Sequence, residues 1–185
     1  MESHIEHLKE CLKQEVMKCD RPFSWVSTIH RAIKCPDRRL NFWWRLANYL
    51  YVSGKNPGLA RKLNRRLLKN YGIEIQLGAR IGKGLRIAHS GGINISHIVV
   101  AGENLLIRQN TTIGAKLDEV KEKCIRIGDN VDIGANSCII GSDLRIGDNV
   151  TIGAMSFINK DIPDNCTAYN KKVISTITLH HKQVS

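Results

Sequence analysis

Histidine is the side chain best suited to take a proton from a hydroxyl group near neutral pH, because its unperturbed pKa lies at about 6.5. The chain has seven histidines. Five of them lie near the two ends of the chain: His4, His7, His30, His180 and His181. The other two, His89 and His97, lie inside a run of regularly spaced aliphatic residues. His89 and His97 are therefore the two candidates for a general base.

The regular run begins after Tyr71, where an aliphatic residue followed by a small residue recurs every six positions. The clearest members are Ile81, Ile87, Ile93, Ile107, Ile113, Ile127, Ile133, Ile139, Ile146, Ile152 and Ile158. A period of six fits neither an α-helix nor a simple alternating strand. It fits a coil with three flat sides and eighteen residues per turn, in which one aliphatic residue per side points inward.

The residues between the aliphatic positions suit tight corners. Glycine follows many of them, and we expect corners where a larger side chain or a negative φ would clash. The Asp-Asn pairs at 129–130 and 148–149 suit the same corners, because Asn and Asp tolerate left-handed backbone angles. The alternative is an α/β sheet. It is disfavoured because no stretch between Tyr71 and the C-terminal tail shows ten residues of helical period.

Residues 71–175 resemble the hexapeptide-repeat acyltransferases, in the branch with serine acetyltransferases and colanic-acid-type polysaccharide O-acetyltransferases. The resemblance rests on the repeats and on the segments at 71–76, 86–92, 100–104, 107–114 and 162–165. It implies a mainly β fold, a left-handed parallel β-helix of hexapeptide repeats with an N-terminal α-helical region. We divide the chain into a helical region (1–70), the β-helix acyltransferase domain (71–168) and a C-terminal tail (169–185).

The resemblance also implies a catalytic pair. His89 matches the family's catalytic histidine, and Glu74 matches the position of an aspartate that orients the histidine in serine acetyltransferases. Glu74 precedes His89 by fifteen residues, just under one expected turn of eighteen, so stacking can bring the two together. A carboxylate on the far ring nitrogen holds an imidazole in one tautomer. The alternatives are a solvent-facing corner histidine and a surface glutamate.

The implied donor is acetyl-CoA, bound in a groove between neighbouring coils of a homotrimer. Its pantetheine arm needs corners of small residues, and the matching pairs are Gly114-Ala115, Gly134-Ala135 and Gly153-Ala154. Lys171 and Lys172 follow the last repeat, where family members place basic residues near the CoA phosphates. The family's Gly-x-Pro-Ala turn is missing there. His97 and Asn110 are candidates for binding the acceptor, and a structural role for His97 is the alternative.

Two departures from serine acetyltransferases favour another acceptor. Those enzymes carry an aspartate directly before the catalytic histidine, where this chain has Ala88. They carry an Arg-His pair in the loop that corresponds to residues 116–123, which here contain neither residue. Without these charges a zwitterionic amino acid would be held poorly. We therefore expect a hydroxyl of a sugar or glycan precursor in surface polysaccharide biosynthesis. The alternatives are serine and a trimeric β-helix that only binds or scaffolds.

The helical region carries most of the positive charge, with a net charge of +9 in residues 1–70 and +2 in the remainder. Helical spacing predicts helices at 4–17, 24–33, 40–51 and 59–70, with Gly72 as a helix cap. Aromatic residues beside cations suit peripheral contact with the inner membrane. We favour packing of Trp43 and Trp44 instead, because a small helical region has few other large residues with which to build a core. The candidate patch contains Arg38, Arg39, Phe42, Trp43, Trp44, Arg45, Arg61, Lys62, Arg65, Arg66 and Lys69.

Composition sets the remaining expectations. The six cysteines form no C-x-x-C pair, and no histidine cluster completes a zinc spacing, so we expect no metal. A carbonic anhydrase on the same fold would need three histidines in the repeats, and only two lie there. No signal peptide or membrane-spanning stretch is evident, which predicts a cytoplasmic protein. We expect no nucleic acid partner.

Overall fold

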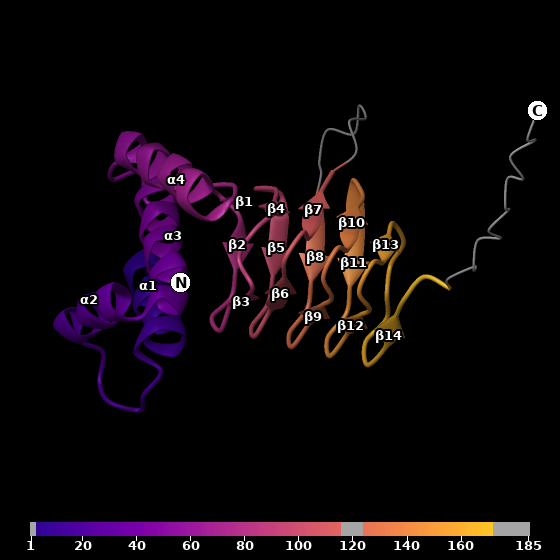
Figure 1. Ribbon diagram of the computed structural model, residues 1–185, viewed down its shortest axis with the longest axis horizontal. Helices are drawn as coiled ribbons and strands as arrows, with labels where there is room; N and C mark the ends of the chain where they lie inside the picture. The colour runs from indigo at the N-terminus through magenta and orange to yellow at the C-terminus, as the bar shows by residue number, and fades with distance from the viewer. Residues whose placement is uncertain (1–2, 116–123, 172–185) are drawn as a thin grey trace, which may run out of the picture.

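Helices gather at one end of the computed structural model, and short strands stack away from them in a row (Figure 1). The structure describes residues 3–115 and 124–171. The helical elements are α1 (His4–Leu12), the π-helical turn η1 (Lys13–Met17), α2 (Trp25–Lys34), α3 (Pro36–Val52) and α4 (Pro57–Tyr71). Among the described residues, none of these helices is long and apolar enough to cross a membrane.

The strands form three parallel sheets, which are the three sides of a parallel β-helix, as predicted. Sheet 1 contains β1 (Ile73–Ile75), β4 (Ile93–Ile95), β7 (Thr112–Gly114), β10 (Cys138–Ile140) and β13 (Phe157–Ile158). Sheet 2 contains β2 (Arg80–Ile81), β5 (Val99–Ala101), β8 (Cys124–Ile127) and β11 (Asp143–Ile146). Sheet 3 contains β3 (Arg86–Ala88), β6 (Leu106–Arg108), β9 (Asp132–Ile133), β12 (Thr151–Ile152) and β14 (Thr167–Ala168).

The number of residues per turn varies from coil to coil. Ile95 pairs with Ile113, the predicted eighteen positions apart, but Ile73 pairs with Ile93 and Ile113 pairs with Ile139. Turns longer than eighteen thus occur where the six-residue step of the sequence slips, as between Ile113 and Ile127. The extra residues fall at corners, where they leave the flat strands and their hydrogen bonds intact. Residues 116–123 follow one such corner and lie outside the described residues.

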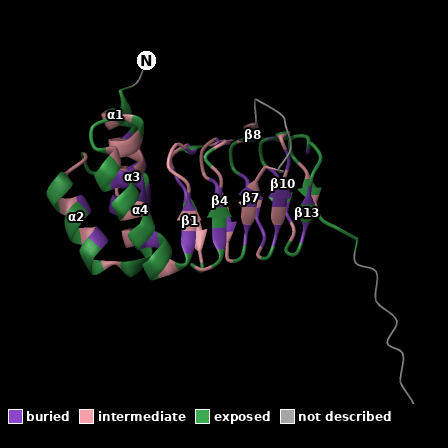
Figure 2. Cartoon of the chain, turned by 90° about the horizontal axis from the view of Figure 1, so that it is seen from above, coloured by how far each residue is buried: buried purple, intermediate pink, exposed green. Residues whose placement is uncertain are grey.

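Each side of the coil contributes two buried residues rather than the single one predicted. Ile107 is fully buried, and so is Leu105 two positions earlier; Val131 and Ile133 repeat the pattern in the next coil. Because side chains alternate across a strand, positions two apart share a face, and both reach the interior. The buried residues form a continuous line along the inside of the coils (Figure 2).

Glycines and asparagines have different roles at the corners. A Cβ on Gly128 would lie 2.7 Å from the carbonyl carbon of Gly147 and would also collide with Asp148, so the close approach of successive coils requires glycine there. Gly128 does not adopt a positive φ, which corrects that part of the prediction. Asn130 and Asn149 take the left-handed conformation instead, each at φ 55°. Their side chains stack, with Asn130 Nδ2 donating to Asn149 Oδ1 at 3.1 Å.

The helices lie close to their predicted positions. Ser24 caps α2, as its hydroxyl accepts from the Ser27 N–H, and Gly72 ends α4 at φ 62°. Helix α3 begins four residues before the predicted start, because Pro36 suits the first turn of a helix. The first predicted helix extends to Met17 as expected, but its last five residues form the π-helical turn.

One face of α3 covers the open end of the first coil. The backbone groups of a terminal coil have no next coil to pair with, and they need other partners. Side chains of α3 at i, i+3, i+4 and i+7 supply these partners. Asn41 donates to Leu85 O, Trp44 to Ile75 O, Arg45 to Ile81 O and Gly82 O, and Asn48 to Ala79 O, at 2.6 to 3.2 Å.

Glu15 of η1 neutralises the buried Arg45. Its carboxylate accepts from Arg45 Nη2 at 2.6 Å and Nε at 3.1 Å, from Asn41 Nδ2 at 3.2 Å and from the Leu85 N–H at 3.0 Å. Burial has the largest single effect and would lower the pKa of Arg45, but the charges of Glu15 and Cys11 and the hydrogen bond to Glu15 together raise it. The ion pair is therefore fully hydrogen-bonded, as a buried pair must be.

The predicted aromatic and basic surface patch is only partly present. Phe42, Trp44 and Arg45 are buried, which confirms the packing favoured for Trp44, whereas Trp43 is 38% exposed and the same expectation is wrong for it. Arg38 donates to the Val16 carbonyl, and Arg39 donates to the Ala32 and Ile33 carbonyls. The α4 members of the patch are exposed, as predicted: Arg61, Lys62, Arg65, Arg66 and Lys69.

Replacing Glu15 by alanine would leave the Arg45 charge buried without its partner. We expect a loss of about 3–5 kcal/mol in the free energy of unfolding, measured by urea denaturation. Glu6→Ala is the matched control, because Glu6 forms an exposed ion pair with Lys9 at 3.0 Å and its loss should cost no more than about 0.5 kcal/mol. Equal effects of the two variants would contradict the structural role assigned to Glu15.

Candidate active site

His89 lies in a corner that is two residues longer than the corner stacked on it. Ala88 pairs with Arg108 before the corner, and Asn94 pairs with Thr112 after it. The coil that carries His89 therefore advances six residues between these two pairs, whereas the coil stacked on it advances four. His89 and Ser90 are the two extra residues, and both are exposed. Extra residues of this kind re-aim a side chain out of the regular surface, as bulges do in sheets.

The backbone at this corner is held tightly although His89 projects from it. His89 has φ 62°, in the left-handed region that is uncommon for residues other than glycine. The Gly92 N–H donates to Gly72 O at 2.8 Å in the layer below, and the Asn110 N–H donates to Gly91 O at 2.9 Å in the layer above. A non-Gly residue with positive φ, fixed from both sides, is the kind of strained position that marks functional sites.

Asn110 lies directly on the corner that carries His89. A Cβ at Gly92 would collide with the Asn110 side chain, so glycine permits this contact. Asn110 Nδ2 donates to Asn136 Oδ1 at 3.0 Å in the next coil. The structure thus brings together two of the predicted site residues, His89 and Asn110.

A line of mostly small residues runs from the His89 corner along the coil axis. The strand register stacks Gly91, Gln109, Ala135, Ala154 and Asn170, which we call the His89 stack. Gly134 and Gly153 flank it. Four strand spacings of roughly 4.8 Å give it a length of about 19 Å, the scale of an extended pantetheine arm. The exposed Lys171 follows Asn170 at the far end, and Lys172 lies outside the described residues.

Gly114 and Ala115 belong to a different corner. Gly114 ends β7 and Ala115 follows it, and the two stack on Ser96 and His97, at the opposite end of sheet 1 from His89. His97 contacts Gln76 there: its backbone N–H donates to Gln76 Oε1 at 3.1 Å, and its Nδ1 lies 2.9 Å from the same atom. A Cβ at Gly114 would meet open space. The predicted donor residues therefore lie on two corners, and the predicted acceptor residues His97 and Asn110 also lie on different corners.

Glu74 lies one layer below the corner that carries His89. It pairs with Asn94, twenty positions away, so the argument from a turn of eighteen is wrong in detail. It remains a neighbour of the corner, because it is two residues beyond Gly72, which binds Gly92. Within the described residues no hydrogen bond joins the Glu74 and His89 side chains. Half-buried Glu74 lines a cleft of about 470 Å³ that Arg61 and Arg65 of α4 also line.

A second cleft lies beside the strand that leads to His89. It measures about 740 Å³ and separates η1 and α3 from β3 and β6. Arg86, Ile87 and Ala88 form one wall. Four amide side chains line it as well: Gln14, Asn41, Asn104 and Asn130. Sequence reasoning missed these residues as a group. Those from the helical region carry no repeat signal, and the sequence does not show which strand the helical region packs against.

Histidine, cysteine and carboxylate side chains do not gather around a common point in the described part of the chain. No group of three that could hold a metal ion occurs in residues 3–115 and 124–171.

Comparisons with known proteins follow the same repeats. No family model matches the chain. The chain is 36% identical over 124 residues to serine acetyltransferase 1 of Arabidopsis thaliana, covering 67% of this chain and 39% of that protein. It is 39% identical over 102 residues to the putative colanic acid biosynthesis acetyltransferase WcaB of Escherichia coli, covering 55% of this chain and 62% of that protein.

Solved structures agree over a longer stretch that includes the helical region. Serine acetyltransferase isoform 3 of Entamoeba histolytica, in complex with cysteine, superposes with a TM-score of 0.75 at 28% identity, covering 96% of this chain and 63% of that one. The serine acetyltransferase of Neisseria gonorrhoeae, in complex with serine, gives 0.68 at 28%, with coverages of 91% and 67%. The chain shares its repeats and its fold with the hexapeptide-repeat acyltransferases. It spans about two fifths of the plant member's length.

A bulky residue on the His89 stack should block a donor that lies along it. We expect Ala154→Leu to weaken CoA binding about tenfold or more, measured by calorimetry, because Ala154 is exposed in the middle of the stack. Pro163→Leu is the control, since Pro163 is also exposed but lies at the corner between sheets 2 and 3, which carries none of the predicted donor residues. A CoA affinity that Ala154→Leu leaves unchanged would remove the donor from this stack.

Proposed function

We propose that this chain is an acetyl-CoA-dependent O-acetyltransferase that acylates a hydroxyl group of a sugar or glycan precursor in surface polysaccharide biosynthesis. The observation that carries the proposal is the joint placement of His89 and the His89 stack. A base that projects from an enlarged corner lies at one end of a line of small residues about 19 Å long, and a cation lies at the other end.

The chemistry follows from this placement. The neutral His89 imidazole takes the proton of the acceptor hydroxyl as its oxygen attacks the thioester carbonyl, and the CoA thiolate leaves. The small side chains of Ala135 and Ala154 let the amides of the pantetheine arm approach the backbone. Lys171 offers a positive charge to the CoA phosphates. Binding along the stack orients the thioester carbon next to His89.

Glu74 acts in this scheme as a positioning residue. A carboxylate on the ring nitrogen that faces away from substrate fixes the imidazole tautomer and stabilises the imidazolium that forms. The two side chains are not hydrogen-bonded in the described residues, and such contacts often tighten only when substrate is bound. A homotrimer would bring the His89 corner of one protomer against the His97 corner of the next, which would join the two groups of predicted donor and acceptor residues.

The 740 Å³ cleft offers amide groups to a hydroxylated acceptor, and the charged residues Glu15, Lys18, Asp37 and Arg86 line it as well. Its amide side chains suit the donors and acceptors of a sugar. Ala88 lines it directly before His89, at the position where serine acetyltransferases carry an aspartate. An apolar residue there leaves an ammonium group without a partner. The second candidate is serine, which is favoured by the printed names of the relatives and of the superposed structures.

Removing the base should abolish most turnover without unfolding the protein. We expect His89→Ala to lower kcat by about 10²–10⁴-fold, measured as release of the CoA thiol. Because His89 is exposed, the thermal unfolding midpoint of the variant should equal that of the parent chain. Glu74→Gln should cost less, since it removes orientation and not the base. A His89→Ala variant with near-parental kcat would disprove the catalytic assignment.

The acceptor is tested by comparing serine with a panel of free, nucleotide-linked and lipid-linked sugars under one assay. We expect acetylation of at least one sugar with kcat/KM ~10-fold or more above that for serine, because Ala88 and residues 116–123 replace the aspartate and the Arg-His pair that serine acetyltransferases carry at those positions. His89→Ala is the control for background thioester hydrolysis. Preference for serine would establish the second candidate, and turnover of neither class would favour a binding or scaffold role.

A further inference from the structure

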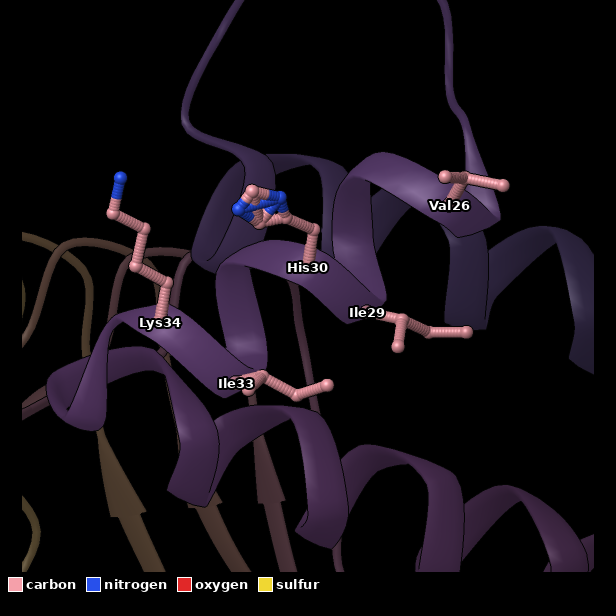
Figure 3. A pocket seen from close by; sticks show the side chains of 5 residues that line it. All are labelled: Val26, Ile29, His30, Ile33 and Lys34. Carbon is pink, nitrogen blue, oxygen red and sulfur yellow. The ribbon is translucent and has the colours of Figure 1, made fainter.

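Helix α2 shows its large apolar side chains to solvent and buries its small ones. Thr28 and Ala32 are buried against the other helices, whereas Val26, Ile29 and Ile33 are 80%, 45% and 68% exposed. A surface helix ordinarily turns its aliphatic side chains toward the core. Figure 3 shows Val26, Ile29 and Ile33 extending to one side of the helix, with His30 and Lys34 rising beside them.

These exposed side chains form a continuous surface. They line a shallow hollow of about 670 Å³ whose rim carries His30 and Lys34. Trp25, which is 38% exposed, extends the surface at the start of the helix, and its ring meets that of the partly buried Phe23 edge to face at 5.0 Å. Contiguous apolar surface of this kind marks a contact with a partner or a membrane. Tryptophan is enriched where a membrane meets water.

The charge around α2 selects between those two occupants. Residues 21–36 contain no Asp or Glu, and they contain Arg21, Arg31 and Lys34. An anionic lipid surface complements such a segment, because basic residues that flank an apolar helix face bind the headgroups. A second copy of the chain would place the same cations opposite one another with no acidic residue in the segment to pair with them.

The position of α2 leaves it free to meet a flat surface. It lies at the end of the molecule opposite the coils in both views (Figures 1 and 2). The His89 stack runs along the coils, away from that end. Contact through α2 therefore leaves the candidate active site open.

We propose that α2 docks the protein on an anionic lipid bilayer, with Val26, Ile29 and Ile33 facing the acyl chains and the neighbouring cations facing the headgroups. This surface differs from the patch expected from the sequence, which centred on residues 38–45 and on α4. The proposal does not depend on the acyl acceptor or on catalysis.

The test is cosedimentation of the full chain with vesicles of phosphatidylcholine, with and without phosphatidylglycerol, at low and high salt. We expect binding only to the anionic vesicles, with release as salt rises, because screening weakens the charge contribution. The variant Val26→Ser/Ile33→Ser should lower the partition constant about tenfold or more, because it removes two aliphatic side chains from the lipid contact. The control is Leu59→Ser/Leu68→Ser on α4, whose side chains are 43% and 45% exposed beside other cations; it should bind as the parent does.

Three results would overturn the proposal. The first is absence of binding to anionic vesicles at low salt. The second is an equal loss of binding in the α2 and α4 variants, since that would reflect charge alone or a general defect. The third is a lower sedimentation coefficient for the α2 variant than for the parent chain, both measured without lipid, because this would show that a second copy of the chain covers α2. Circular dichroism melting of both variants verifies that each remains folded, since the substituted side chains are exposed.

Discussion

The open end of the first coil is the constraint on which the rest of the structure depends. A parallel β-helix pairs each coil with the next, so its first coil presents a row of unpaired backbone carbonyls. Here α3 satisfies that row through Asn41, Trp44, Arg45 and Asn48, which share one face of the helix. Arg45 can serve there only because Glu15 accompanies it into the interior. The helical region is thus the cap without which the first coil would expose unpaired backbone carbonyls.

The same cap determines how rigid the candidate active site is. Glu15 accepts a hydrogen bond from the Leu85 N–H, and Asn41 donates to the Leu85 carbonyl, so the residue before β3 is held on both sides. His89 lies directly after β3. Its corner is fixed in turn by Gly72 below and Asn110 above. A base held by its surroundings loses less freedom in the transition state, so the buried ion pair contributes to the order of the candidate site, and Glu15 also lines the cleft beside β3.

Sequence reasoning predicted the parts of the fold that depend on local pattern. The hexapeptide period predicted the coil, and helical spacing with Gly72 as a cap predicted the helices, with ends that differ from the observed ones by at most four residues. It could not give the register, because insertions at corners change the turn length while leaving the period within each block unchanged. The two extra residues at His89 were missed for that reason, and so was the layer of Glu74. Burial of Arg45 was missed because its partners Glu15, Ile81 and Gly82 are remote in the sequence.

Net charge and aromatic content likewise say little about which side of a helix faces water. Arg45, Arg38 and Arg39 seem equivalent to Arg61 and Arg65 in a charge count, yet the first three bind carbonyl groups or a buried carboxylate and the last two are exposed. Helix α2 makes the same point for apolar residues. Its periodicity correctly predicted a helix, but periodicity alone cannot tell whether the aliphatic stripe faces the core. The core under α2 is already filled by Leu8, Leu12, Val16 and Phe42, so only Thr28 and Ala32 are small enough to approach it. The larger side chains are therefore left facing outward, which makes an outside partner the remaining way to bury them.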